Sequence, residues 1–222
     1  MRLRLCLALL IALLPANRLR LFAYRRLLGY EIGAGSRIGP FNLIACRTLR
    51  LGPGATIGRW NVLRGAFDLS AGPRLFVGHG NVFACPDRLD HPKLAGRGYA
   101  RRIEFGADCL VNDGHYLDGH GRITVGDGTW LAGRDSQFFT HGASARDRDI
   151  AIGAGCFVGS AVRFAPGSGV GDACVVGIGS VVVGRIDADE ALVSGFPARV
   201  VRGIAEERAA GRFVFSRADW AA

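Results

Sequence analysis

The sequence predicts an all-β solenoid that follows a helical segment, and three features of its repeat predict this fold. Large apolar residues recur at every sixth position, most of them are followed directly by glycine, and the fourth residue after each is small or polar, as between residues 152 and 182. This period fits neither an α-helix, which repeats about every 3.6 residues, nor a strand, which repeats about every two. Because repeats this short cannot bury an apolar face alone, they must stack on one another.

The composition excludes several other classes of protein. The chain has 222 residues, of which 49% are hydrophobic, and its 33 glycines do not recur at every third position. Disordered chains have few apolar residues, collagens need a strict glycine period, and polytopic membrane proteins need several apolar runs of about 18 residues or more. We therefore expect one elongated domain with a substantial core.

The charge of the chain is strongly positive. Its 28 Lys and Arg residues oppose 19 Asp and Glu residues, which gives a net charge of +9, and Lys93 is the only lysine. Guanidinium groups bind phosphate through a bidentate fork, which suits nucleic acid, anionic lipid or a phosphate-bearing cofactor. The sequence has no aromatic and basic module of the nucleic-acid-binding type, so we expect no nucleic-acid partner. The six cysteines include no CxxC pair, which favours a reducing compartment and a cytoplasmic location.

The first element, residues 1–29, is a basic and apolar helical segment. Its apolar run from Leu5 to Leu14 is too short to cross a hydrocarbon core of about 30 Å. A second helical pattern of Leu19, Phe22, Ala23 and Leu27 follows it, and six arginines frame the two patterns: Arg2, Arg4, Arg18, Arg20, Arg25 and Arg26. Three alternatives stay open, namely a helix that caps the next domain, an amphipathic helix on an anionic membrane surface, and a cleaved signal peptide.

The second element, residues 30–186, carries the repeat. Its large hexad residues are Ile32, Ile38, Ile44, Leu51, Ile57, Leu63, Leu69, Phe105, Val111, Leu117, Val125, Leu131, Ile152, Val158, Phe164, Val170, Val176 and Val182. The small corner positions are Ser36, Ala55, Asn61, Asn81, Cys109, Thr129, Cys156, Val162, Ser168, Cys174 and Ser180. A prism with a large inward residue on each flat side and a small one at each corner explains both sets, and glycine after the large residue suits a corner that needs positive φ.

Two insertions interrupt the repeat, near residues 85–102 and 140–149, and residues 187–222 form a C-terminal extension. Loops that leave a rigid solenoid are where function usually resides. The second insertion contains His141, which makes this histidine a candidate functional residue.

The stretch from residue 105 to residue 203 contains the ordered motifs TH, VGS, PG, GxGSVV and FPARVVR. In this order they resemble the hexapeptide-repeat acyltransferases, in particular the maltose and galactoside O-acetyltransferases and the acetyltransferases of exopolysaccharide synthesis. The resemblance implies a left-handed parallel β-helix, a homotrimer, acetyl-CoA as acyl donor with no metal requirement, and a sugar or glycolipid acceptor. It also implies a role in polysaccharide or cell-envelope biosynthesis.

The same resemblance implies catalytic roles for three residues. A histidine at the place of His141 is the general base in that family, which suits an imidazole that titrates near neutral pH. Asn112 stands near the family's acceptor-orienting asparagine, with one residue fewer before the LD pair. Asp118 could orient a histidine ring, bind a sugar hydroxyl or form a turn, and Asp135, six residues before His141, could also hold the imidazole tautomer.

By match to the motifs, the resemblance also implies a CoA site between neighbouring subunits. Its candidate residues are Gly159, Ser160, Gly177, Gly179, Arg199 and Arg202. Glycines allow the pantetheine to approach the backbone, and arginines bind the phosphates. Ile178 replaces the family's alanine, which leaves the length of the acyl chain open.

Two other functions stay open from the residues alone. His79, His115 and His120 could bind zinc, as in the gamma-class carbonic anhydrases, which are also trimeric β-helices. Alternatively, the chain is a scaffold without catalysis, because a fold does not by itself imply an activity.

Overall fold

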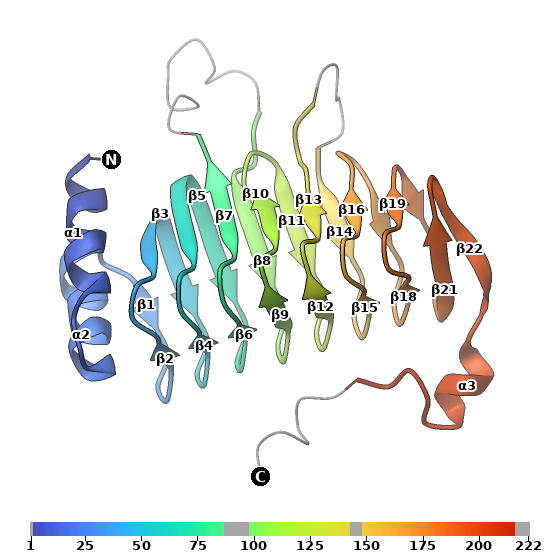
Figure 1. Cartoon of the computed structure of the whole chain (residues 1–222), viewed down its shortest axis with the longest axis horizontal. Helices are drawn as coiled ribbons and strands as arrows, with labels where there is room; N and C mark the ends of the chain where they lie inside the picture. The colour runs from blue at the N-terminus through green and yellow to red at the C-terminus, as the bar shows by residue number, and fades with distance from the viewer. Residues whose placement is uncertain (1, 87–97, 143–147, 216–222) are drawn as a thin grey trace.

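The structure is a computed structural model that describes residues 2–86, 98–142 and 148–215. It is a left-handed parallel β-helix, as predicted, with helices across its N-terminal end (Figure 1). The helices are α1 (Arg2–Ala12), α2 (Asn17–Leu27) and α3 (Ala205–Ala209). The strands are β1 (Glu31–Ile32), β2 (Arg37–Ile38), β3 (Leu43–Leu51), β4 (Thr56–Ile57), β5 (Val62–Ala71), β6 (Phe76–Val77), β7 (Val82–Cys85), β8 (Arg102–Phe105), β9 (Leu110–Asp113), β10 (Tyr116–Asp118), β11 (Arg122–Val125), β12 (Trp130–Arg134), β13 (Gln137–Phe138), β14 (Ile150–Ile152), β15 (Phe157–Val158), β16 (Arg163–Phe164), β17 (Gly169–Val170), β18 (Val175–Val176), β19 (Val181–Val182), β20 (Arg185–Ile186), β21 (Ala191–Gly195) and β22 (Ala198–Gly203).

The strands of the described residues form two sheets, one of 13 strands and one of nine. The larger sheet covers two sides of the prism because β3 and β5 bend around a corner. In β5, Leu63 pairs with Phe83 of β7, whereas Leu69 pairs with Ile103 of β8 on the next side. Every pairing is parallel except that of β21 with β22. Equivalent residues of successive coils therefore lie directly above one another.

The core consists of the inward residues of the hexads. In the nine-stranded sheet, Val111 pairs with Leu131, Leu131 with Val158, and Val158 with Val176. All of the predicted large and small hexad residues are buried, which confirms both positions of the repeat. Burial of each large side chain favours folding by about 1.5–3 kcal/mol.

The glycines that follow the large residues have a different purpose from the one the sequence suggested. A Cβ on Gly33 would lie 2.4 Å from the backbone nitrogen of Pro53, and one on Gly52 would lie 2.6 Å from the backbone of Gly72. These glycines are needed because the next coil is close, and their φ angles are not positive. Positive φ occurs two residues later, at Gly35 and Gly54.

One corner contains a buried ladder of polar side chains. Each bond runs from a backbone amide nitrogen to the side-chain oxygen of an asparagine. The backbone nitrogen of Asn61 donates to Asn42 Oδ1 (2.8 Å), that of Asn81 to Asn61 Oδ1 (2.9 Å), and that of His115 to Asn81 Oδ1 (2.8 Å). The Ser136 amide nitrogen then donates to His115 Nδ1 (3.1 Å). Side chains of successive coils thus satisfy the backbone groups that the corner leaves without sheet partners.

The N-terminal helices cap the β-helix. Their inner side buries Ala8, Ile11 and Tyr24 on the first coil. Polar groups of the segment bind the open backbone edge of this coil: Arg20 Nε donates to Ile38 O (2.8 Å), and the Tyr24 hydroxyl donates to Asn42 O (3.2 Å). The capping alternative is therefore confirmed. Among the described residues, no helix has the length and hydropathy to cross a membrane.

At the other end, the parallel sheet continues beyond residue 186, where the sequence places the end of the repeat. Val176 of β18 pairs in parallel with Val193 of β21, and β22 then returns antiparallel to β21. The C-terminal extension thus begins with one more strand of the solenoid, and its last residues, 216–222, lie outside the described part.

Candidate active site

Three side chains with acid–base chemistry meet at the corner where both insertions leave the solenoid. Asp118 ends β10, His120 lies two residues later, and His141 follows β13. Strands β10 and β13 are parallel neighbours, with Leu117 paired to Phe138, so the coil register brings Asp118 and His141 together. The Nδ1 atoms of the two imidazoles contact the two oxygens of the Asp118 carboxylate, one on each.

The Asp118 carboxylate is fully buried and surrounded by donors. Its Oδ2 accepts from the amide nitrogen of Thr140 (2.9 Å) and from the Thr140 hydroxyl (3.0 Å), and its Oδ1 accepts from the amide nitrogen of His120 (3.2 Å). Burial alone raises the pKa of this carboxyl, but the hydrogen bonds from His120 and His141 outweigh burial and lower its pKa to about 2. Asp118 is therefore ionised at neutral pH.

An ionised carboxylate only accepts hydrogen bonds, so each imidazole must donate from Nδ1. In the neutral rings this leaves both Nε2 atoms without a proton and able to act as bases. The side chain of His141 is 45% exposed, whereas that of His120 is 4% exposed and stacks on the His141 ring at a centroid distance of 4.1 Å. His141 is therefore the base that a molecule in solution can reach.

The described ends of the two insertions meet beside His120. The Tyr99 ring, from the end of the first insertion, contacts the His120 ring edge-on at a centroid distance of 5.8 Å. The guanidinium of Arg148, from the end of the second, lies 4.7 Å from the centre of the Tyr99 ring. The middles of the insertions, residues 87–97 and 143–147, lie outside the described residues.

The sequence analysis named two aspartates, Asp118 and Asp135, as candidates to orient His141. In the structure only Asp118 contacts His141 among the described residues. Asp135 is exposed at the corner that follows β12, with φ of 63°. Strand β13 lies between this corner and His141, which separates the two residues although they are close in sequence. The interpretation of Asp135 as the orienting residue is therefore wrong.

Asn112 lies on β9, in the nine-stranded sheet, whereas Asp118 belongs to the other sheet. Its backbone oxygen accepts from Asn81 Nδ2 (2.7 Å), as part of the polar ladder. Within the described part of the chain, no hydrogen bond joins its side chain to Asp118, His120 or His141. Its catalytic role remains a prediction.

The three histidines named for zinc do not meet within one chain. His115 is buried in the ladder, where its Nδ1 accepts from Ser136, and burial lowers its pKa to about 4. His79 Nδ1 accepts from the Arg59 amide nitrogen (3.0 Å) at an exposed corner. Within the described residues of one chain, the side chains close enough to share a metal ion are Asp118, His120 and His141. His79, His115 and His120 therefore form no site within one chain, and a zinc site that combines them across subunits stays a prediction.

The glycines predicted to bind CoA occupy one corner of two successive coils. Gly159 and Ser160 follow β15, Gly177 and Gly179 follow β18, and the Gly179 amide nitrogen donates to Ser160 O (3.0 Å). A Cβ on Gly159 would lie 3.0 Å from Val176 O, so coil packing by itself favours glycine there. Gly179 has φ of 71° with open space where a Cβ would be, so a ligand could reach its backbone.

The two predicted phosphate-binding arginines lie on β22, and their hydrogen bonds differ. The Arg202 guanidinium pairs with Glu207 and donates to Gly203 O (3.0 Å), whereas Arg199 Nη1 donates to the adjacent Ala198 O (2.8 Å). Nearby, Ile178 and Phe196 are 76% and 80% exposed. This region and His141 lie at different corners of the prism, so one chain alone does not bring the predicted donor residues to the base.

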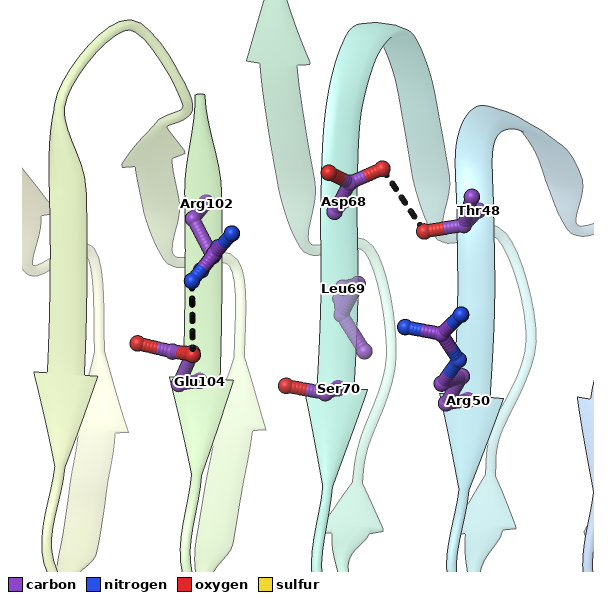
Figure 2. Close-up of a pocket in the computed structure, with 7 residues that line it drawn as sticks. All are labelled: Thr48, Arg50, Asp68, Leu69, Ser70, Arg102 and Glu104. Atoms are coloured by element: carbon purple, nitrogen blue, oxygen red, sulfur yellow. Dashed lines mark hydrogen bonds and ion pairs between the residues drawn. The ribbon is translucent and has the colours of Figure 1, made fainter. Parts of the chain in front are cut away.

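A separate hollow of about 170 Å³ lies on the outer side of β3, β5 and β8. Its lining consists of Thr48, Arg50, Asp68, Leu69, Ser70, Arg102 and Glu104 (Figure 2). The charges there compensate one another: Asp68 binds Arg47 and Thr48, and Arg50 binds Glu31 at 3.0 Å. Neither this hollow nor the pairing of His120 with Asp118 is apparent from the sequence.

No family model and no curated protein matches the sequence. Solved structures do match: the polySia-specific acetyltransferase NeuO has a TM-score of 0.59 at 15% identity, over 78% of this chain and 81% of its own. LpxA from Acinetobacter baumannii has a TM-score of 0.55 at 14% identity, over 82% and 66%. The UDP-N-acetylglucosamine acyltransferase from Campylobacter jejuni has a TM-score of 0.54 at 13% identity, over 86% and 76%. The chain therefore shares the left-handed parallel β-helix of these structures.

Proposed function

We propose that the chain is an acyl-CoA-dependent O-acyltransferase that acetylates a hydroxyl group of a sugar or glycolipid, with His141 as general base. The observation that carries the proposal is the contact of a buried, ionised Asp118 with Nδ1 of an accessible histidine. The similar structures support the reaction class, because two of their names describe an acetyltransferase specific for polySia and a UDP-N-acetylglucosamine acyltransferase. A role in polysaccharide or cell-envelope biosynthesis in the cytoplasm would follow.

In the proposed mechanism His141 performs both proton transfers. His141 Nε2 takes the proton of the acceptor hydroxyl as the oxygen attacks the thioester carbonyl, and Asp118 stabilises the imidazolium that forms. The carbon–sulfur bond then breaks, and the imidazolium returns its proton to the CoA thiolate. The products are the acetyl ester and CoA, and His141 is again a neutral base.

The proposed site for the acyl donor, acetyl-CoA, consists of the residues that follow β18 and lie on β22. Gly179 offers open backbone to the pantetheine, and Arg199 and Arg202 offer guanidinium groups to the phosphates. Because these residues and His141 lie at different corners of one chain, we infer a homotrimer in which the neighbouring subunit completes the site. Light scattering that shows a fully active monomer would contradict this assembly.

Two sets of substitutions test the function. His141→Ala should lower turnover by about 100-fold or more with nearly unchanged CoA binding, because a positioned base contributes about two to four orders of magnitude. The double variant Arg199→Ala with Arg202→Ala should mainly weaken CoA binding. His79→Ala, an exposed histidine at another corner, is the matched control and should be fully active.

Thiol release from acetyl-CoA with a panel of glycan acceptors measures turnover, and mass spectrometry identifies the product. Normal transfer by His141→Ala would refute the mechanism. A scaffold without catalysis would show no turnover in any variant, including the unmodified chain.

A further inference from the structure

The outer side of the N-terminal cap is an exposed apolar surface. We call it the N-terminal face, and it consists of side chains of α1, α2 and the residues that join them: Leu3, Leu9, Leu10, Leu13, Leu19, Phe22 and Leu27. Each is between 50% and 74% exposed. Figure 1 shows both helices lying across the end of the β-helix. An exposed apolar cluster of this kind marks an interaction surface.

Capping of the β-helix does not explain why this face is apolar. Other residues of the same helices pack on the first coil. In α2 the side packed on the first coil includes Arg20, Leu21, Ala23 and Tyr24, while Phe22 points outward at 63% exposure. Capping needs one apolar side of each helix, and the segment has two.

The charges around the face select its partner. Residues 1–30 contain no Asp or Glu. Arg4, Arg20 and Arg25 donate to backbone oxygens of the protein. Arg18 and Arg26 are exposed beside the apolar side chains of α2. An apolar face on a segment whose only charges are cations is complementary to an anionic bilayer surface.

Two aromatic rings extend the apolar surface beside the end of α1. The Phe41 amide nitrogen donates to Ala12 O (2.8 Å), and the exposed rings of Phe41 and Trp60 stack at a centroid distance of 4.5 Å. Both residues have φ near 60°, a conformation that favours glycine, and Gly80 occupies the same corner in the next coil. Bulky aromatic residues in strained, exposed positions suggest selection for a surface contact, and such rings favour the membrane interface.

We propose that the N-terminal face binds an anionic lipid bilayer peripherally, with its leucines and Phe22 in the headgroup and acyl boundary and Arg18 and Arg26 on the lipid phosphates. The helices are too short to span, so the chain would lie on the surface with the β-helix outside the bilayer. In a cytoplasmic protein this surface would be the inner face of the membrane. The proposal does not depend on the acyltransferase activity.

The test is co-sedimentation of the full chain with phosphatidylglycerol-containing vesicles and with pure phosphatidylcholine vesicles. The unmodified chain should bind the anionic vesicles and lose affinity as salt rises. Leu10→Glu with Phe22→Glu should weaken binding at least 100-fold, because two inserted apolar side chains are lost. Arg18→Gln with Arg26→Gln should weaken it roughly 30-fold. Val214→Glu, an exposed apolar position in the C-terminal extension, is the matched control and should bind normally.

Circular dichroism melting of each variant shows whether the fold is intact. We expect an intact fold because all five substituted positions are exposed. Equal binding to neutral vesicles, or full binding by the Leu10 and Phe22 variant, would overturn the proposal. The proposal would also be overturned if light scattering shows that the chain self-associates through this face in solution and the chain does not bind vesicles. Binding is measured without turnover, so its failure would leave the proposed function untouched.

Discussion

Replacement of Asp118 by asparagine tests the central contact of the site with almost no change in shape. Asp118 accepts on both oxygens, from Thr140 and His141 on one and from His120 on the other. Asparagine converts one oxygen to an NH₂ group, which donates and therefore cannot face an N–H. One imidazole must then accept at Nδ1 and carry its proton on Nε2. If this ring is His141, the base is lost. If it is His120, the imidazolium that forms on His141 still loses the carboxylate charge that stabilises it.

The expected loss is large because the tautomer decides whether His141 can act. The equivalent change in the serine protease triad lowers turnover about 10⁴-fold, so we expect a fall of about 10³- to 10⁴-fold here, or about 4–5.5 kcal/mol in the barrier. The loss of charge-assisted hydrogen bonds to a buried group should also lower the free energy of unfolding by about 1.5–3 kcal/mol.

Thiol release from acetyl-CoA, with the acceptor on which the unmodified chain is most active, provides the rate, and urea denaturation provides the stability. Asp135→Asn in the same assay is the matched control and should keep full turnover, because Asp135 is exposed at another corner and does not contact His141 among the described residues. Turnover of Asp118→Asn within tenfold of the unmodified chain, with intact folding, would refute the tautomer argument.

Three further changes test the candidate site around Asp118 and the buried polar ladder. His120→Gln should lower turnover, because the Asp118 carboxylate loses the imidazole on one of its oxygens and the His141 ring loses its stacking partner; unchanged turnover would show that His120 only fills space. The lowered pKa of Asp118 should make the protein about 2 kcal/mol less stable as pH falls from about 4 to about 2, and the stability is fully present above this window. Denaturation of Asp118→Asn at both pH values should lack this dependence. Asn81→Ala should lower the free energy of unfolding by about 2–4 kcal/mol, because the buried amide of His115 loses its acceptor, and a urea titration that finds no loss would contradict the ladder.

The sequence predicts the solenoid because the repeat is a local property. Each hexad residue is inward for the same reason, so one coil is a guide to the others, and all of the assigned positions are buried. The sequence assigned the glycines after the large residues to positive φ, and this reason is wrong. Glycine is needed there because the next coil lies close, and the sequence of one repeat does not show that distance. The backbone of Pro53, next to Gly33, belongs to a different repeat.

The candidate site is less predictable because it depends on which coil stacks on which. Asp118 and His141 are adjacent only through the pairing of β10 with β13, and the insertions change the number of residues per coil. By sequence distance Asp135 is closer to His141, but the chain turns a corner between them. The sequence also does not show that Nδ1 of His120 contacts the Asp118 carboxylate.

For the N-terminal segment, the sequence also does not show which arginines bind the protein's own backbone and which stay exposed. The sequence treats its arginines as equivalent, but the first coil has an open edge whose carbonyl groups need donors, and Arg4 and Arg20 bind them. A parallel solenoid always has such an edge, and the residues that close it are lost to any outside partner. Only the arginines that remain, Arg18 and Arg26 among them, can contribute to attraction toward lipid. Composition therefore overstates the charge available at this end, and the outward leucines must provide most of the binding free energy.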